Sequence, residues 1–287
     1  MRRSLEPLDT VLGFAAFTRQ HHTIYLLNYA CHPVVLGPNT HVSADYVGRL
    51  VQAVEEQGHK ALFMQGFCGD IDPFVNKHRW GSGTEQDLDF YGRQLASRVA
   101  SFVCVAEHTE ETTLRFGESR IEVPLSALST DRLEEQKNII RNSLGANAEC
   151  ERFAEQWAND LQSSPLFGRR APVLREAPLQ IMAIGDLFPF CYPAEVFCEV
   201  GLALRDQYGP CMLVGYANGN VGRIPTAAAF DNPNDYACYL APKFYAVLAF
   251  RPNVAAVFLR ATESLAHEMA IMPDTARGSV AKKTECG

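Results

Sequence analysis

The stretch that organises this chain runs from Thr23 to Pro33 and reads TIYLLNYACHP. Residues 23–30 are rich in β-branched and aromatic side chains, which is typical of a strand. Pro33 has no N–H to donate and favours an extended conformation in the residue before it, so His32 is predicted to lie where the strand gives way to a loop. Such positions often carry catalytic or metal-binding groups. His32 is therefore a candidate functional residue, and the alternative is a core histidine hydrogen-bonded to backbone.

Strand-like and helix-like patterns alternate on both sides of this stretch. The segments expected as strands are 11–18, 23–30, 61–65, 112–123, two short strands within 179–190, and 211–217. The segments expected as helices are 43–57, 84–107, a helical excursion over 131–161 broken near Gly145, 194–208 and 253–269. Residues 163–178 are expected as a loop. The alternation predicts an α/β fold with mixed sheets and flanking helices, in one domain over residues 1–272 and a disordered tail over 273–287.

Composition excludes several classes of protein. The chain has 287 residues, 47% of them hydrophobic, and a formal net charge of -7, which does not resemble the basic surface of a nucleic-acid binder. No apolar run reaches the roughly 20 residues that cross a bilayer, and the N-terminal residues show no signal-peptide pattern. The nine cysteines include no Cys-x-x-Cys pair, so free thiols and a cytoplasmic location are expected.

Besides the loop at His32, a second loop carries acidic residues. Residues 65–73 follow a predicted strand and read QGFCGDIDP. Glycines there let backbone N–H groups point at one spot, as an anion site requires. Asp70 and Asp72 are candidates to orient a histidine or bind a cation, and a tight turn capped by aspartate is the alternative.

Two further loops supply a carboxylate and a guanidinium. Residues 191–197 read CYPAEVF and place Glu195 at the predicted start of a helix, where the macrodipole favours an acid; a metal ligand or general base is the other interpretation. Residues 215–226 read GYANGNVGRIPT, in which Arg223 is a candidate to hold an anion or an ordinary surface arginine. Loops after successive strands often converge in α/β proteins.

In this order the motifs NYACHP (28–33), GDIDP (69–73), PAEVF (193–197) and YANGNVGRIPT (216–226) resemble a known family. They are similar to the catalytic domain of neutral/alkaline non-lysosomal ceramidases, above all to shorter prokaryotic relatives without the C-terminal immunoglobulin-like domain. Those proteins are zinc amidohydrolases that cleave the N-acyl bond of ceramide. The resemblance, from about Arg2 to about Met269, implies one zinc ion and an N-acyl lipid or related amide as substrate.

The resemblance also implies roles for individual residues. His32 and Glu195 match zinc ligands, and Asp70 matches the aspartate of a loop beside the metal. Tyr236 matches a tyrosine that helps to bind the carbonyl oxygen. Two protein ligands are fewer than the three that catalytic zinc usually has.

Three departures from the family pattern favour other hypotheses. Arg2-Arg3 resembles an arginine pair that follows a histidine-containing segment, so a further zinc ligand is expected to be missing or to come from a partner chain. Arg223 stands where the family usually has a tyrosine close to the metal, and Asp72 replaces a serine. The alternatives are therefore a catalytically inactive relative that acts as a binding protein or is an incomplete gene product, and a metal-free anion site at Arg223.

Overall fold

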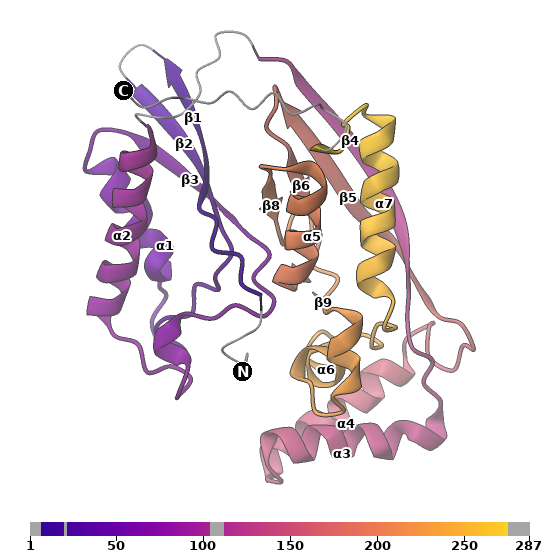
Figure 1. Cartoon of the computed structure of the whole chain (residues 1–287). Coiled ribbons are helices and arrows are strands. Elements are labelled where there is room, and N and C mark those ends of the chain that lie inside the picture. Colours follow the sequence, from indigo (N-terminus) through magenta and orange to yellow (C-terminus); the bar gives the residue numbers. More distant parts are fainter. Residues whose placement is uncertain (1–6, 20–21, 104–111, 275–287) are drawn as a thin grey trace.

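A three-stranded sheet contains residues 23–29, the strand that leads to His32. The computed structural model describes residues 7–19, 22–103 and 112–274. Strands β1 (Gly13–Arg19), β2 (His22–Tyr29) and β3 (Lys60–Gln65) lie in that order, with β1 antiparallel and β3 parallel to β2 (Figure 1). The prediction of a strand before His32 is thus confirmed, and this strand is the central one of its sheet.

Two helices cover one face of this sheet. They are α1 (Asp45–Glu55) and α2 (Glu85–Val103), and α1 packs on the sheet while α2 packs on α1 (Figure 1). Tyr25 and Leu27 alternate onto the helix side of β2 and are buried there against Leu50 of α1. At the start of α2 Thr84 and Asp87 form a capping box, in which the Thr84 N–H donates to Asp87 Oδ2 at 2.8 Å.

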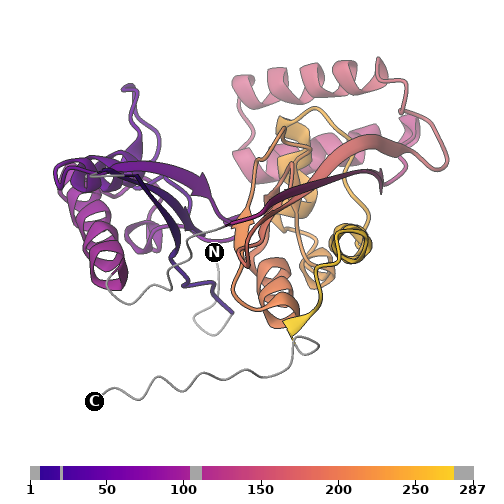
Figure 2. The same ribbon diagram turned by 90° about the horizontal axis from the view of Figure 1, so that it is seen from above.

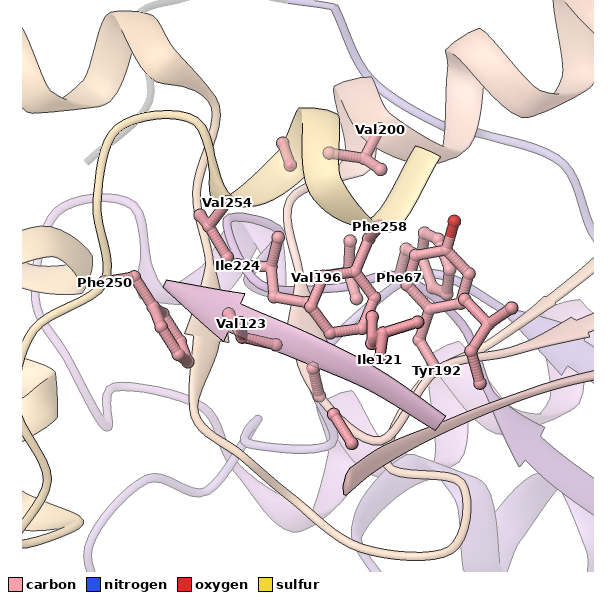
Figure 3. Close-up of a cluster of buried hydrophobic side chains, with 14 of the residues drawn as sticks. Phe67, Ile121, Val123, Tyr192, Val196, Val200, Ile224, Phe250, Val254 and Phe258 are labelled. Carbon is pink, nitrogen blue, oxygen red and sulfur yellow. The ribbon is translucent and has the colours of Figure 1, made fainter. Parts of the chain in front are cut away.

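A four-stranded sheet forms the other half of the molecule. Its order is β4 (Leu114–Pro124), β5 (Val173–Ile184), β6 (Pro189–Cys191) and β8 (Met212–Val214), and only the β6–β8 pair is parallel. Helix α7 (Val254–Glu268) packs on β4 and β5, and α5 (Cys198–Tyr208) contacts α7. Phe67, Tyr192 and Phe258 lie together in the largest apolar core (Figure 3).

The predicted helical excursion is a pair of helices that connects β4 to β5. Helix α3 (Leu133–Leu144) ends at Gly145, which has φ +85°, and α4 (Ala148–Gln162) follows, capped by the Asn147 side chain. Seen from above, the pair lies across the β4–β5 ribbon from α7 (Figure 2). The shorter helical segments are η1 (Phe74–Asn76), η2 (Thr130–Arg132), η3 (Ala227–Asp231), η4 (Tyr236–Leu240) and α6 (Ala241–Phe244).

One buried side chain joins the two sheets. Asn28 of β2 donates from its amide nitrogen to the Met64 and Leu213 carbonyl oxygens, each at 2.9 Å, and accepts from the Leu213 N–H at 3.1 Å. The Gly215 N–H, just after β8, donates to the Gln65 carbonyl oxygen at 2.9 Å. The carboxyl ends of β2, β3 and β8 are therefore held side by side.

The structure corrects two of the predicted elements. Glu195 does not begin a helix: it lies in the short strand β7 (Glu195–Val196), which pairs in parallel with β9 (Arg223–Ile224), and α5 starts only at Cys198. The loop predicted over 163–178 ends earlier, because β5 starts at Val173. Residues 173–178 already belong to the part of β5 that pairs with β4, and Pro178 is the register partner of Arg120. Proline is tolerated there because β6 borders β5 only at Gln180 and Ile181.

The described residues form a mixed α/β fold with several sheets and flanking helices, as predicted. Apart from Pro273 and Asp274, the predicted tail lies outside the described residues. Within the described part of the chain, no helix combines the length and apolar character needed to cross a membrane. The described cysteines are free thiols, which agrees with the expectation from their spacing.

Candidate functional site

Backbone hydrogen bonds bring the first three candidate loops together. Strands β2 and β3 are parallel, so their carboxyl ends meet at one edge of the sheet. The His32 N–H donates to the Ile71 carbonyl oxygen at 2.9 Å, which joins the first loop to the second. The Gly69 N–H donates to the Val196 carbonyl oxygen at 2.7 Å, which joins the second loop to the third. A β-carbon at Gly69 would lie 2.8 Å from the Val196 carbonyl carbon, so this approach requires glycine.

The fourth loop joins the site through the β7–β9 pair. Glu195 is the register partner of Arg223, and the Glu195 N–H donates to the Gly222 carbonyl oxygen at 3.0 Å. Asn218 (φ +61°) and Gly219 (φ +140°) form the turn that returns the chain to this position. All four candidate loops therefore converge at one place.

Glu195 is the centre of the resulting cluster. Its Oε1 lies 2.5 Å from His32 Nε2 and 2.5 Å from Arg223 Nη2, and its Oε2 accepts from the Tyr245 hydroxyl at 3.0 Å. The other terminal nitrogen of Arg223 donates to the Gly69 carbonyl oxygen at 2.5 Å. Only 4% of the Glu195 side chain is exposed, so one carboxylate is shared by two cationic groups out of solvent.

The geometry determines the charge of His32. Its Nδ1 lies 3.0 Å from the Ile71 carbonyl oxygen and its Nε2 lies against Glu195, so both ring nitrogens act as donors and the imidazole is positively charged. Burial opposes this charge, but hydrogen bonds to Cys68 and Glu195 outweigh burial and raise the pKa of His32 to about 10. Burial likewise opposes ionisation of Glu195, but His32 and Arg223 hold the pKa of its carboxyl below the usual value.

The remaining predicted site residues occupy different positions around this cluster. Asp72 is exposed, and its Oδ1 lies 3.5 Å from His32 Nδ1. Asp70 accepts from the Cys198 N–H at 2.9 Å and so holds the start of α5. The ring of Tyr236 lies under the Arg223 guanidinium, with the ring centre 5.0 Å from the guanidinium carbon. Asp72 and Tyr236 therefore border the cluster, whereas Asp70 anchors a helix.

Three residues of the site were missed by the sequence analysis. Tyr245 donates to Glu195, and the Tyr216 hydroxyl lies 3.4 Å from His32 Nε2 and 3.8 Å from the thiol of Cys68. Cys68 is fully buried and belongs to the second loop, and Tyr216 belongs to the fourth, so the motifs contained both without marking them. No sequence signal pointed to Tyr245, because only the tertiary fold brings it to Glu195.

The donor atoms at this site do not fit the zinc ion that the resemblance implied. His32 Nε2 and Glu195 Oε1 bond directly to each other, and the Arg223 guanidinium occupies the same oxygen. Catalytic zinc usually takes three protein ligands and an uncharged imidazole. Across residues 7–19, 22–103 and 112–274 there is no group of three or more His, Cys, Asp or Glu side chains suited to a metal. As arranged, the cluster is a closed salt-bridge network.

The fold belongs to the class of α/β folds found in ceramidases. Among the solved structures that match, two cover 88% of the chain: one titled "Ceramidase complexed with C2", with a TM-score of 0.54 and 16% identity, and the neutral ceramidase from Pseudomonas aeruginosa, with a TM-score of 0.52 and 18% identity. The matched region is 46% and 45% of those chains, so this chain spans less than half the length of either. At such identities the likeness shows the fold. No family model and no curated protein matches the sequence.

Proposed function

We propose that this chain is a ceramidase-fold protein that binds an N-acyl lipid amide at the cluster of His32, Glu195 and Arg223 without zinc-dependent hydrolysis. The observation that carries the proposal is the sharing of Glu195 Oε1 by the cationic groups of His32 and Arg223. The substrate class comes from the likeness to ceramidases, and the loss of metal chemistry comes from the arginine.

Arg223 supplies at Glu195 the positive charge that a metal ion would supply. A guanidinium 2.5 Å from Glu195 neutralises the carboxylate and repels any divalent cation that approaches it. Both terminal nitrogens of Arg223 are engaged, by Glu195 and by the Gly69 carbonyl oxygen, whereas its Nε–H is buried without a hydrogen-bond partner among the described residues. The exposed residues Tyr216 and Tyr236 border the cluster, and their hydroxyl groups are the candidates to bind an amide or hydroxyl group of a lipid.

A second candidate is zinc-dependent hydrolysis of the same kind of amide, and one observation favours it. The His32 Nδ1–H bond to the Ile71 carbonyl oxygen is the arrangement that commonly holds a metal-binding histidine with Nε2 directed at the ion. In this case Arg223 would have to leave Glu195, and a further ligand would come from another segment or a partner chain.

The zinc content of the purified protein distinguishes the two candidate functions. It is measured in the wild type, in Arg223→Tyr and in the surface control Arg260→Tyr. We expect far less than one zinc per chain in the wild type and the control, and a clear gain in Arg223→Tyr, since the change removes the competing cation. Zinc near one per chain in the wild type, lost in both His32→Ala and Glu195→Ala, would instead establish the second candidate.

Lipid binding is measured on the same variants by the anisotropy of a fluorescent short-chain ceramide, with product analysis for hydrolysis. We expect saturable binding and no cleavage by the wild type. His32→Ala is expected to bind the ceramide more weakly, because the substitution removes one of the two cationic groups that hold Glu195 in place. The absence of saturable binding by a folded wild type rejects the proposed function.

A further inference from the structure

A second candidate site shares no residue with the cluster at Glu195. It is a partly open cavity of about 230 Å³ lined by residues of α4 and of the segments 126–136 and 230–252. It includes neither His32, Glu195 nor Arg223. Helix α6 stacks on α4 beside it, with the rings of Phe153 and Phe244 5.2 Å apart (Figure 1).

The cavity contains a buried lysine. Lys243 is 5% exposed, and its ammonium group donates to Gln136 Oε1 at 3.1 Å and to the Tyr239 carbonyl oxygen. The ammonium nitrogen lies 5.3 Å from the centre of the Trp157 ring. Within the described chain it forms no ion pair with a carboxylate, and burial alone lowers the pKa of Lys243 to about 8. An unpaired buried cation is costly, and such a group in a cavity is a candidate for ligand binding.

A second unpaired donor belongs to a residue that lines the same cavity. Trp157 lines the cavity and is 3% exposed, and its indole N–H is buried without a hydrogen-bond partner among the described residues. Buried donors are nearly always paired in folded proteins, so an unpaired one beside a cavity indicates a missing acceptor. Lys243 thus provides a cation without an anionic partner, and Trp157 provides a neutral N–H donor without an acceptor.

The other residues that line the cavity indicate which groups a ligand carries besides its acceptor. The apolar side chains among its lining residues include Leu128, Leu161, Phe230, Val247, Leu248 and Phe250. No aspartate or glutamate lines it, and the guanidinium of Arg132 is paired with Glu135. A fitting ligand therefore carries one anionic acceptor and a small apolar body, and it is smaller than the drug-sized ligands of ordinary pockets.

We infer that this cavity binds a small monocarboxylate with a short aliphatic chain, whose carboxylate accepts hydrogen bonds from Lys243 and Trp157. This site is independent of the proposed function, since it shares no residue with the cluster at Glu195. Inorganic phosphate carries the negative charge that Lys243 requires but has no apolar part to contact the cavity wall. An aliphatic alcohol has the apolar part but lacks the negative charge.

Isothermal titration calorimetry of the full chain at pH 7 tests the inference, with sodium octanoate, octan-1-ol and inorganic phosphate as the three probes. We expect octanoate to bind at least tenfold more tightly than the other two. Lys243→Met is expected to abolish octanoate binding, and Trp157→Phe, which removes only the N–H donor, to weaken it about five- to tenfold, as loss of one hydrogen bond implies. Lys60→Met changes an exposed lysine on β3 and should leave the affinity unaltered.

A second measurement on the wild type alone guards against a variant that fails to fold. Octanoate affinity should fall about tenfold per pH unit above the pKa of Lys243, since only the ammonium form holds the carboxylate. The other titratable groups that line the cavity are Arg132 and Tyr239, and burial raises the pKa of Tyr239, so neither changes charge between pH 7 and 9. Equal affinity for octanoate and octan-1-ol, or an octanoate affinity constant over this pH range, overturns the inference.

Discussion

At the scale of single residues, two buried charged groups differ in whether a group of opposite charge is paired with them. Glu195 is surrounded by His32, Arg223 and Tyr245, so its charge is compensated on every side that the structure describes. Lys243 has hydrogen-bond acceptors and an aromatic ring but no anion. Removing His32 or Arg223 is therefore expected to destabilise the fold, and removing Arg223 is also expected to let a metal ion approach Glu195. Removing the charge of Lys243 should instead stabilise the fold.

Lys243 makes stability depend on pH. The ordinary lysine pKa of 10.5 in the unfolded chain falls to about 8 in the folded chain. Between these values the unfolded chain binds more protons, so stability rises as pH increases from 8 to 10.5, and the full penalty acts below 8. Lys243→Met should raise the free energy of unfolding at pH 7 by about 1–3 kcal/mol, and by less at pH 10.

Urea denaturation at pH 7 and pH 10 measures this difference, with Lys60→Met as the matched control. Lys60 is exposed, so its replacement should change stability by less than about 0.5 kcal/mol at either pH. A loss of stability in Lys243→Met at pH 7, or a gain of equal size at both pH values, contradicts the prediction.

At the scale of elements, the sequence indicated the positions of the loops better than their conformations. The composition of residues 23–30 and the proline after His32 were enough to predict β2 and its end, because both signals are local. Glu195 looked like the first residue of a helix for an equally local reason, the preference of acids for helix N-termini. Its actual strand conformation depends on β9, which is remote in sequence, so a local rule could not find it.

The same limit applies to the site. The four motifs identified His32, Glu195 and Arg223, and the fold brings these three into contact. The direct bond between His32 and Glu195 was not predicted, since it depends on how far apart two separate loops lie. Tyr245 follows the short helix α6 and carries no motif, so its contact with Glu195 depends on the tertiary packing of α6 on η4 and of η4 on β9.

The approach of the second loop to β7 can be tested with one added methyl group. A β-carbon at Gly69 would lie 2.8 Å from the Val196 carbonyl carbon and 2.9 Å from its oxygen, both backbone atoms that cannot rotate away. Gly69→Ala should therefore lower the free energy of unfolding by about 1–3 kcal/mol. It should also speed hydrogen exchange in residues 66–73, because the Gly69 N–H bond to Val196 is lost.

Gly13→Ala is the matched control for this substitution. A β-carbon at Gly13 meets its nearest neighbour at 3.6 Å, an ordinary van der Waals contact. This variant should be within about 0.5 kcal/mol of the wild type. If both alanine variants are equally stable, the close packing of the second loop on β7 is not what holds the site together.

At the scale of the whole molecule, there are two sheets, each covered by its own helices (Figure 1), and the candidate site lies where segments that follow them meet. His32 leaves the first sheet, whereas Glu195 and Arg223 belong to segments that follow the second. The cluster can therefore form only while the two sheets hold their relative position. The buried amide of Asn28, which contacts strands of both sheets, is the side chain best placed to maintain it.

Replacement of Asn28 by leucine, of similar size, should separate the roles of packing and hydrogen bonding at this junction. Asn28→Leu removes three hydrogen bonds and leaves the Leu213 N–H and carbonyl groups without this partner in a buried position. The free energy of unfolding should fall by about 2–4 kcal/mol, as expected for unpaired buried backbone groups. Because Asn28 links the sheets, unfolding followed by urea should also become less cooperative, with a lower m-value or two transitions. Asn142→Leu, on the exposed surface of α3, should leave both quantities near the wild-type values. A loss below about 1 kcal/mol with an unchanged m-value would mean that apolar packing, and not this amide, keeps the two halves of the site in register.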